Sequence, residues 1–298
     1  MEITFLGTSS MVPTKDRNVQ SIYLEYNGEG ILFDCGEGTQ RQMNIARINR
    51  LKVKKIFISH WHGDHVSGLV GLIQTVGNTE NPGKLTIFGP KGTKKHMAHL
   101  MNSCIFDLRI EIEIKELVAD KPKVVFETDS YEVLAASMTH GVPCLAYSFV
   151  EKDRRKMNAS KLKKLGISGA DIGKLQRGES VKLTGKIVEP DDVSEVIRGK
   201  KISLVLDTSL NDNISLLAKD SDLLIGEATY ESSKENKAEE YNHMTAEQMA
   251  IVANNSNVKS LVLTHFSQRY KTLHDLEKEA KEIFPNTIMA FDFLKLKV

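Results

Sequence analysis

The sequence predicts an α/β fold in which packed sheets carry polar side chains at the ends of their strands. Short apolar runs that are typical of buried strands recur along the chain, for example at residues 56–58 and 223–226. Several of these runs end in a histidine or a carboxylate, and segments with helical patterns lie between them. Strand ends that collect at one edge of a sheet are where α/β folds place their sites. We therefore expect one functional site at such an edge.

The elements of the first half follow from short-range patterns. Residues 2–6 alternate as a strand, and residues 20–26 and 30–34 predict two strands joined by a hairpin at Asn27-Gly28. A helix is expected through Ile48. Beyond the run at 56–58, apolar residues 66–73 predict the first turns of a buried helix.

The second half repeats the same alternation. Strands are expected at residues 85–90, 110–118, 123–127, 131–138, 201–208, 223–226 and 258–263, and helices at 91–103 and 245–254.

Composition and charge are those of a globular protein. The chain has 298 residues, of which 41% are hydrophobic and 27% charged, and its formal net charge is +1. A surface that binds a polyanion must therefore arise from local clustering of charge. The cysteines Cys35, Cys104 and Cys144 show no CxxC spacing and predict buried thiols in a reducing cytoplasm. Neither a signal peptide nor an apolar stretch of about 18–20 residues is evident, so we expect a cytoplasmic protein without membrane contact.

Four ligand-type residues lie within six positions directly after the apolar run at 56–58. They are His60, His62, Asp64 and His65. A pair of histidines alone would be weak evidence, because most histidines belong to the core or the surface. Imidazole and carboxylate are ligands that Zn²⁺ accepts. If Gly63 lets the backbone fold back tightly, His60 and His62 can face one ion while Asp64 and His65 face a neighbouring one.

Further ligand-type residues follow later apolar runs. His140, Asp207, Glu227 and His265 each stand at the end of a predicted strand, and His243 precedes the helix at 245–254. His140 can complete the ligands of His60 and His62, and Asp207 could bridge two ions. This repetition predicts a single site with two metals.

The composition changes between residues 151 and 187. This segment has eleven lysines and arginines against four acidic residues up to Lys186. Its apolar residues are too sparse for an independent core, so we expect a protruding helical arm. Runs of charge are usually solvated surface, but charge of one sign in a near-neutral protein favours a polyanionic partner.

The His-x-His-x-Asp-His run resembles the signature of the metallo-β-lactamase superfamily of dinuclear zinc hydrolases. Within it, the whole chain resembles the ribonuclease Z family, whose members trim the 3′ end of precursor tRNA. The resemblance rests on Gly7-Thr8-Ser9-Ser10, residues 13–18, Asp34-Cys35-Gly36-Glu37-Gly38-Thr39-Gln40, the zinc loop, His140-Gly141, Glu227-Ala228-Thr229-Tyr230, His243-Met244-Thr245, His265-Phe266-Ser267-Gln268-Arg269-Tyr270 and the basic arm. Two positions depart from the family: Gly169-Ala170 replaces Gly-Pro in the arm, and Val205-Leu206 replaces Ser-Gly before Asp207.

The resemblance implies a fold, a metal content and a set of roles. The fold is an αβ/βα sandwich of two packed mixed sheets flanked by helices, a single catalytic domain over residues 1–298 with the arm inserted at 151–187. Two Zn²⁺ ions are held per subunit: His60, His62 and His140 bind one, Asp64, His65 and His265 bind the other, and Asp207 bridges them. Asp64 orients a water and takes its proton.

The resemblance also implies a reaction and partners. His243, held by Glu227, protonates the leaving 3′ oxygen or stabilises the transition state. The implied products are a tRNA with a 3′ hydroxyl and a trailer with a 5′ phosphate. A homodimer is implied, in which the arm of one subunit serves the site of the other. RNA is expected to bind through its backbone at Lys15, Arg17, Arg269 and the arm residues Lys152, Arg154, Arg155, Lys163, Lys164, Lys174 and Arg177.

Two other functions fit part of the pattern. A small-molecule phosphodiesterase or another hydrolase of the same fold would share the zinc ligands, but it would not need a basic arm or the pair of His243 and Glu227. A non-catalytic RNA-binding module would be expected to lose ligands, whereas all seven positions are filled. The sequence leaves open whether the ions are zinc or manganese, and whether a 3′ CCA blocks cleavage.

Overall fold

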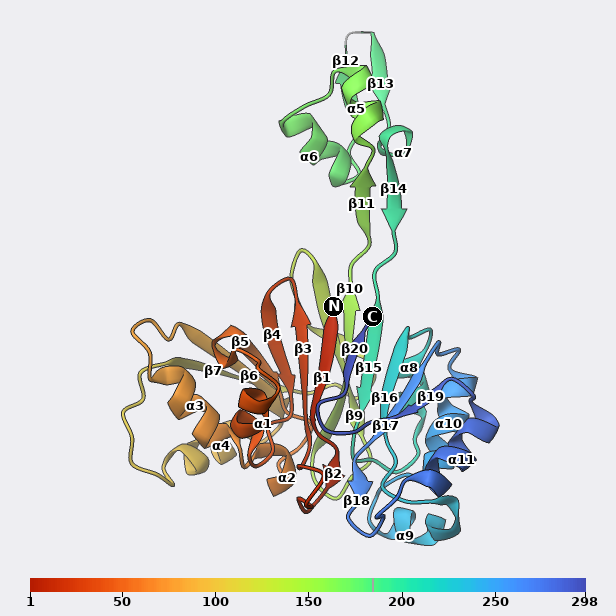
Figure 1. Cartoon of the computed structure of the whole chain (residues 1–298). Helices are drawn as coiled ribbons and strands as arrows, with labels where there is room; N and C mark the ends of the chain where they lie inside the picture. Colours follow the sequence, from red (N-terminus) through yellow and green to blue (C-terminus); the bar gives the residue numbers. More distant parts are fainter. Residues whose placement is uncertain (184) are drawn as a thin grey trace. The chain divides into compact units, whose positions relative to one another are not determined.

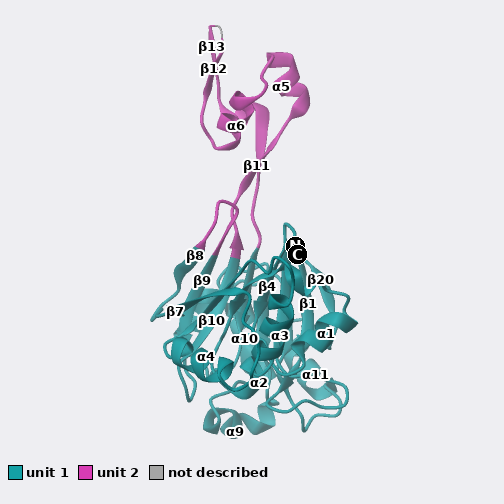
Figure 2. Cartoon of the chain, turned by 90° about the vertical axis from the view of Figure 1, so that its left-hand side faces the viewer, with its two compact units in different colours: residues 1–126, 133–149, 201–298 teal, residues 127–132, 150–200 magenta. Residues whose placement is uncertain are grey.

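The computed structural model describes residues 1–183 and 185–298. The chain divides into two compact units. Unit 1 contains Met1–Phe126, Val133–Phe149 and Lys201–Val298, and unit 2 contains Glu127–Glu132 and Val150–Lys200 (Figure 2).

Two seven-stranded mixed sheets form the centre of unit 1 (Figure 1). In spatial order, the first sheet contains β20 (Lys295–Lys297), β1 (Glu2–Gly7), β3 (Ser21–Tyr26), β4 (Glu29–Phe33), β5 (Val53–Phe57), β6 (Lys84–Pro90) and β7 (Glu111–Leu117). The second contains β19 (Thr287–Met289), β17 (Leu261–Thr264), β16 (Leu223–Glu227), β15 (Lys201–Val205), β10 (Cys144–Glu151), β9 (Tyr131–Met138) and β8 (Lys123–Glu127). The strands predicted from the alternating and apolar runs are thereby confirmed.

The inner faces of the two sheets pack against each other through aromatic side chains. Tyr147 on β10 lies 5.2 Å from the Phe57 ring on β5, and its hydroxyl donates to the Ile58 carbonyl oxygen at 2.7 Å. Tyr26 and Phe149 meet edge to face at 5.2 Å. Such pairs add to the free energy gained by burying the rings. The result is the two-layer core that the α/β prediction required.

Helices cover the outer face of each sheet (Figure 1). On the first sheet these are α1 (Thr39–Ile45), α3 (Leu69–Gly77) and α4 (Thr93–Met101), which bury Met43, Leu72 and Met97. On the second they are α8 (Asp212–Ala218), α10 (Ala246–Asn255) and α11 (His274–Ile283). Helix α9 (Glu235–Glu240) and the short helices η1 (Arg50–Lys52) and η2 (Ser232–Lys234) lie in connections. None of the helices in the described parts of the chain is long and apolar enough to span a bilayer.

The hairpin between β3 and β4 is confirmed. Tyr26 pairs with Glu29 across a two-residue turn, and Asn27 and Gly28 both have left-handed backbone conformations, with φ of 49° and 82°. A two-residue turn of this kind requires positive φ at both positions, which Asn-Gly tolerates best.

The loop that carries His60, His62, Asp64 and His65 is shaped by glycines other than the one predicted. The helix expected at 66–73 is two helices, α2 (Gly63–Val66) and α3, separated at Ser67 and Gly68. A Cβ on Gly68 would lie 2.1 Å from the Gly36 carbonyl oxygen, and one on Gly36 would lie 2.3 Å from the Asp64 carbonyl oxygen. A Cβ on Gly63 meets only Ser67 Oγ, at 3.4 Å. The role given to Gly63 is therefore wrong, because the close approach occurs at Gly36 and Gly68.

Unit 2 has a small core of its own, contrary to the prediction. Its elements are β11 (Arg154–Met157) paired with β14 (Ser194–Ile197), helices α5 (Ala159–Leu165), α6 (Ala170–Gln176) and α7 (Pro190–Val193), and the hairpin of β12 (Val181–Leu183) and β13 (Lys186–Val188). The buried side chains are Leu162, Ile167, Leu175, Val181, Val188 and Val193. Half of them come from the hairpin and from α7, which the expectation of a purely helical arm left out.

The prediction of three buried thiols is wrong for one of them. Cys35 and Cys144 are buried, but Cys104 is exposed. It follows the end of α4 in a stretch without regular structure, where no sheet or helix covers the side chain.

Candidate metal centre

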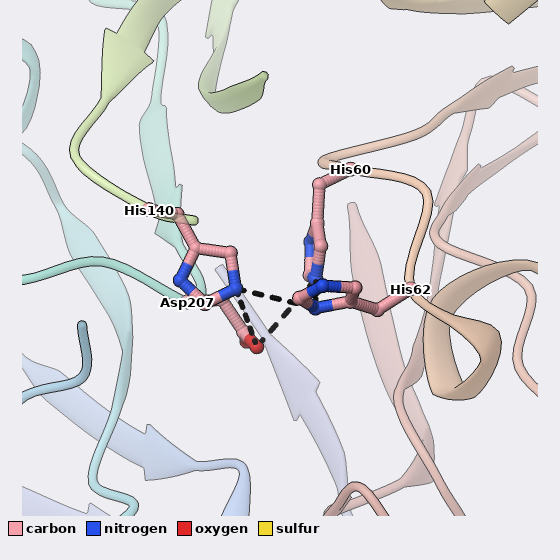
Figure 3. A group of neighbouring side chains, drawn as sticks. All are labelled: His60, His62, His140 and Asp207. Carbon is pink, nitrogen blue, oxygen red and sulfur yellow. Dashed lines mark hydrogen bonds and ion pairs between the residues drawn. The ribbon is translucent and has the colours of Figure 1, made fainter. Parts of the chain in front are cut away.

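Seven ligand-type side chains gather where strands of both sheets end. His60 follows β5, His140 follows β9, Asp207 follows β15 and His265 follows β17. Helix α2 adds three more from one turn and its N-cap: His62, Asp64 and His65. The ligand atoms of these seven residues form two groups, each within 4.8 Å: His60, His62, His140 and Asp207 in the first (Figure 3), and Asp64, His65 and His265 in the second. A third group of the same size joins Asp207 and His265 to His243.

In the first group, nitrogens and one oxygen surround a common point. His62 Nδ1 lies 2.9 Å from His60 Nε2 and 3.3 Å from His140 Nε2. Asp207 Oδ2 lies 3.7 Å from His60 Nε2 and 4.0 Å from His140 Nε2. Ligands at the usual zinc distances in a tetrahedron are about 3.3 Å apart. The group therefore has the dimensions of a four-ligand site.

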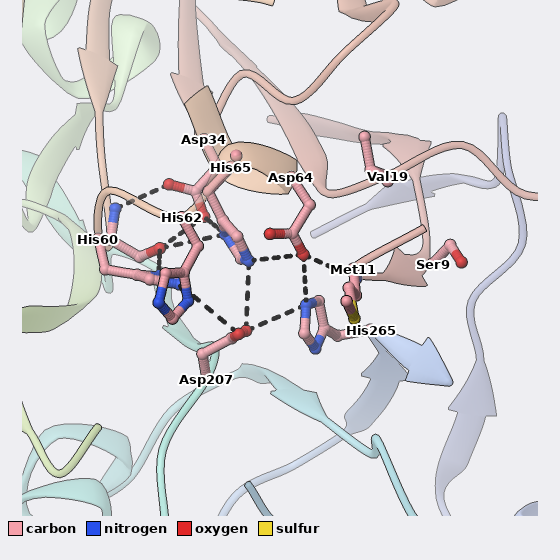
Figure 4. Close-up of polar contacts among 12 residues, drawn as sticks. Ser9, Met11, Val19, Asp34, His60, His62, Asp64, His65, Asp207 and His265 are labelled. Atoms are coloured by element: carbon pink, nitrogen blue, oxygen red, sulfur yellow. Dashed lines mark hydrogen bonds and ion pairs between the residues drawn. The ribbon is translucent and has the colours of Figure 1, made fainter. Parts of the chain in front are cut away.

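The second group uses the other oxygen of Asp207 (Figure 4). Asp207 Oδ1 lies 3.1 Å from His265 Nε2 and 3.5 Å from His65 Nε2. Asp64 Oδ2 lies 3.6 Å and 3.4 Å from the same two nitrogens. The two carboxylate oxygens of Asp207 are thus divided between the groups, as a bridging ligand requires.

Buried atoms without hydrogen bonds show that a cation fits this site. His65 Nε2, His265 Nε2 and Asp207 Oδ1 are all buried, and none of them makes a hydrogen bond. Buried polar atoms are normally paired, because leaving one unpaired is costly. One cation in the second group would satisfy all three atoms. The nitrogen and oxygen donors are those of a metal site.

Electrostatics agree with this assignment. Burial lowers the pKa of His60 well below its usual value, aided by His65, so His60 is held in the neutral form that binds metal. Burial opposes ionisation of Asp207, but His265 and His65 hold its pKa well below its usual range. Burial likewise lowers the pKa of His65, yet Asp207, Asp34 and Asp64 raise it well above. The site therefore attracts positive charge.

Second partners fix the orientation of the histidines. His65 Nδ1 donates to Asp34 Oδ2 at 2.6 Å, and His140 Nδ1 donates to the Asn242 carbonyl at 3.1 Å, so Nε2 of each ring is left to face the ligand groups. Asp34 is fully buried and also accepts the Ser59 N–H and hydroxyl, each at 2.7 Å. The sequence argument gave Asp34 no role, although it too follows an apolar strand, β4.

A histidine and a glutamate lie beside the metal ligands. His243 Nδ1 is 3.1 Å from both carboxylate oxygens of Glu227. Glu227 is fully buried and accepts the Thr208 N–H at 2.7 Å and the Thr229 hydroxyl at 2.6 Å. Burial would lower the pKa of His243, but Glu227 raises it to about 9. The imidazolium therefore stays protonated at neutral pH.

His243 connects two cavities. One, of about 410 Å³, is lined by ligands of both groups and by Ser10, Met11, Tyr241 and His243. The other, of about 590 Å³, shares those four residues and adds Tyr230, Lys237 and Arg269 among others. The two cavities therefore adjoin at these four residues.

Comparison with known proteins places the chain in a family. The ribonuclease Z of Methanothermobacter thermautotrophicus is 42% identical over 100% of this chain and 97% of its own length. That of Bacillus subtilis is 38% identical over 100% and 99%. This chain belongs to the ribonuclease Z family. The family described as anti-Pycsar protein Apyc1 also matches, over residues 1–117.

Solved structures agree with this ribonuclease Z assignment. The short form of human tRNase Z has a TM-score of 0.73 and 27% identity, with 100% of this chain and 99% of the human chain covered. The metallo-β-lactamase fold protein YhfI from Bacillus subtilis has a TM-score of 0.71 at 16% identity, covering 99% and 98%. The predicted metallo-β-lactamase sandwich is confirmed.

The three basic residues of unit 1 that are expected to contact RNA differ in their surroundings. Lys15 is exposed. Arg17 Nη2 donates to the carbonyl oxygens of Tyr270, at 2.8 Å, and Ser267, at 3.3 Å. Arg269 lies over the Tyr230 ring, 4.8 Å from its centroid. RNA contact by these three side chains stays a prediction.

The basic residues of unit 2 also differ in their surroundings. Four of them form ion pairs within the unit: Lys152 with Glu127, Arg155 with Asp191, Lys174 with Asp171 and Arg177 with Glu179. Arg154, Lys163 and Lys164 are exposed. All seven stay predicted RNA contacts of the ribonuclease Z arm.

Proposed function

We propose that the chain is the tRNA 3′ processing endoribonuclease of its family. It cuts precursor tRNA so that the tRNA keeps a 3′ hydroxyl and the trailer leaves with a 5′ phosphate. The observation that carries this proposal is the pair of ligand groups that share Asp207, with His243 and Glu227 beside them. The full-length match to ribonuclease Z supports it.

The site is proposed to hold two zinc ions. His60, His62 and His140 would hold one ion and Asp64, His65 and His265 the other, with Asp207 between them. Nitrogen-rich donors favour zinc over manganese. When bound, the two ions supply a water of lowered pKa and neutralise charge on the scissile phosphate.

The protein side chains supply orientation and proton transfer. Asp64 orients the attacking water and accepts its proton, while the Met11 N–H holds Asp64 Oδ2 at 2.7 Å. His243 directs Nδ1 to Glu227 and is left with Nε2 to protonate the departing O3′ of the tRNA. The contact with Glu227 favours the protonated form of this ring. Charge on the leaving oxygen is thus neutralised as the P–O bond breaks.

Recognition of the tRNA body is proposed for unit 2. Arg154, Lys163 and Lys164 are the first candidates, because their exposed cations can reach phosphates at little cost. We further propose a homodimer in which unit 2 of one subunit serves the active site of the other, and a cytoplasmic location, where precursor tRNA is found. The family resemblance supports these three proposals.

The experiment is cleavage of a 3′-extended tRNA precursor by three proteins: wild type, Asp64→Ala, and a variant lacking unit 2. For the last, residues 152–199 are replaced by a short glycine linker. The Glu151 N–H donates to the Lys200 carbonyl oxygen at 2.8 Å, so the cut ends are already adjacent. A small phosphodiester is assayed in parallel.

The proposal predicts three results. Wild type cuts after the discriminator base, Asp64→Ala cuts nothing, and the variant without unit 2 loses tRNA cleavage but keeps the small diester. If wild type leaves tRNA intact while it hydrolyses the small diester with or without unit 2, the protein is a small-molecule phosphodiesterase.

A further inference from the structure

A polar loop, residues 8–18, donates a hydrogen bond to the metal centre. The Met11 N–H points at Asp64 Oδ2, 2.7 Å away (Figure 4). This oxygen is the one that lies 3.4 Å from His65 Nε2 and 3.6 Å from His265 Nε2. Met11 has φ of 61°, a left-handed conformation that is unfavourable for methionine. The surroundings of the loop must therefore impose this conformation.

The two ends of the loop are held together at its base. The Asn18 carbonyl oxygen accepts the N–H groups of Thr8, at 2.9 Å, and Ser9, at 2.8 Å. Asp292, far away in sequence, holds the same ends: Oδ2 accepts the Asn18 N–H at 2.7 Å, and Oδ1 accepts the Thr8 hydroxyl at 2.9 Å. Both ends of the loop thus converge on one carboxylate.

Further bonds fix this carboxylate and the loop. Gln42 Nε2 donates to Asp292 Oδ2 at 2.9 Å and to the Leu6 carbonyl oxygen at 2.8 Å. Arg17, within the loop, donates to the Tyr270 carbonyl oxygen at 2.8 Å, just beyond the ligand His265. The loop is therefore anchored to the segments that contain Asp292 and Tyr270, and its tip has little freedom to move away from the metal ligands.

We propose that Asp292 is a positioning residue for Asp64, acting through the loop 8–18 and the Met11 N–H. A carboxylate suits this place because it accepts hydrogen bonds on both oxygens and here receives three donors. An asparagine can accept hydrogen bonds on one side only, so it would hold the three donors less well and loosen the base of the loop. The effects on the loop and on zinc binding do not depend on the proposed function. An effect of Asp292 on RNA cleavage would rest on it.

The test uses the full chain with Asp292→Asn, and Ser148→Ala as the matched control. Ser148 is buried and loses its hydrogen bond to Ser203 Oγ, at 2.6 Å, between strands β10 and β15. Hydrogen exchange is followed in peptides covering residues 8–18, and zinc affinity is measured by competition with a coloured chelator. In Asp292→Asn we expect exchange about 10-fold faster in the loop, and one zinc bound about 10-fold more weakly. The control should show neither change.

A milder variant covers the case in which Asp292→Asn does not fold. Thr8→Val removes one donor at nearly constant shape and should change loop exchange and zinc affinity in the same direction, by less. The proposal is overturned if loop exchange and zinc affinity stay at wild-type values in the folded variants, even where the melting temperature falls. Neither readout involves RNA, so a wild type that does not cut tRNA would refute the proposed function and leave this inference standing.

Discussion

His65 Nδ1 lies 2.6 Å from Asp34 Oδ2, in a buried contact that leaves Nε2 of His65 directed at Asp64 and Asp207. A histidine that donates one ring N–H to a carboxylate is fixed in tautomer and orientation and is a more basic ligand. The strand that ends before Asp34 thus sets the direction of a ligand on the neighbouring strand's loop.

Replacing Asp34 by asparagine should weaken metal binding. The amide accepts poorly compared with a carboxylate, so His65 loses part of its orientation and basicity. We expect zinc affinity to fall by about 10- to 100-fold, measured by chelator competition. Asp16→Asn, an exposed aspartate in the polar loop, is the control and should bind zinc as wild type does. Unchanged affinity in Asp34→Asn would contradict the role given to this contact.

Glu227→Gln should slow cleavage without emptying the site. The glutamine keeps the shape but not the charge that holds His243 protonated, so proton donation to O3′ weakens. A loss of about 100-fold in kcat is expected, at the low end for general acid catalysis, with KM and zinc content close to wild type. A loss of zinc affinity of the same size would instead show that Glu227 supports the ligand His265 through Thr229, whose hydroxyl donates to Glu227 and lies 3.1 Å from His265 Nδ1.

Removing the metals should abolish cleavage and spare RNA binding. The ligand groups lie in unit 1, whereas the exposed cations Arg154, Lys163 and Lys164 lie in unit 2. Chelator-treated protein should therefore retain binding of precursor tRNA in a filter or polarisation assay, and added zinc should restore cutting. Binding that disappears with the metals would show that the metal centre itself holds the RNA.

Asp292 should make stability depend on pH in an unusual direction. Burial raises its pKa to about 6, although Asn18, Thr8 and Arg17 oppose the rise. Asp292 lines a surface cavity together with the charged residues Lys15, Asp16 and Arg41. From about pH 4 to pH 6 the folded chain holds a proton that the unfolded chain has lost, so the free energy of unfolding falls as pH rises. The contribution is complete below about pH 4 and lost above about pH 6.

The measurement compares metal-free wild type with Asp292→Asn in urea at several pH values. The stability of wild type relative to the variant should fall by at most about 2–3 kcal/mol across this window. A difference that does not change with pH would show that Asp292 titrates normally.

Leu175→Ala should unfold unit 2 alone. Leu175 is fully buried in the small core of that unit, and truncation of a buried leucine costs about 2–5 kcal/mol. We expect loss of tRNA cleavage, unchanged hydrolysis of a small diester, and fast hydrogen exchange confined to residues 150–200. Leu165→Ala, a partly buried neighbour, should have a smaller effect.

Local sequence patterns predicted most of the fold. Apolar runs predict the strands. Asn27-Gly28 predicts the hairpin, because its turn requires positive φ at both positions. The residues now seen in the two ligand groups could be picked out because each follows a strand and has a metal-binding side chain. Asp34 met both criteria and was still left without a role.

The remaining features depend on contacts between distant segments. Nothing near Met11 or Asp292 in the sequence shows that their segments meet Asp64 and Asn18, because burial and hydrogen bonding at those places arise only once both sheets have packed. Gly36 and Gly68 likewise show their importance only through the atoms that approach them. The core of unit 2 was not predicted because Val181 and Val188 lie in strands of three residues and Val193 in a helix of four, all too short to produce a period.

The order of the ligands along the chain has a consequence for synthesis. His60 is made well before His265 and Asp292. A chain still on the ribosome therefore cannot complete the second ligand group or close the loop that steadies Asp64. The metal centre is therefore completed only after the segments that carry its later ligands have been added to the chain.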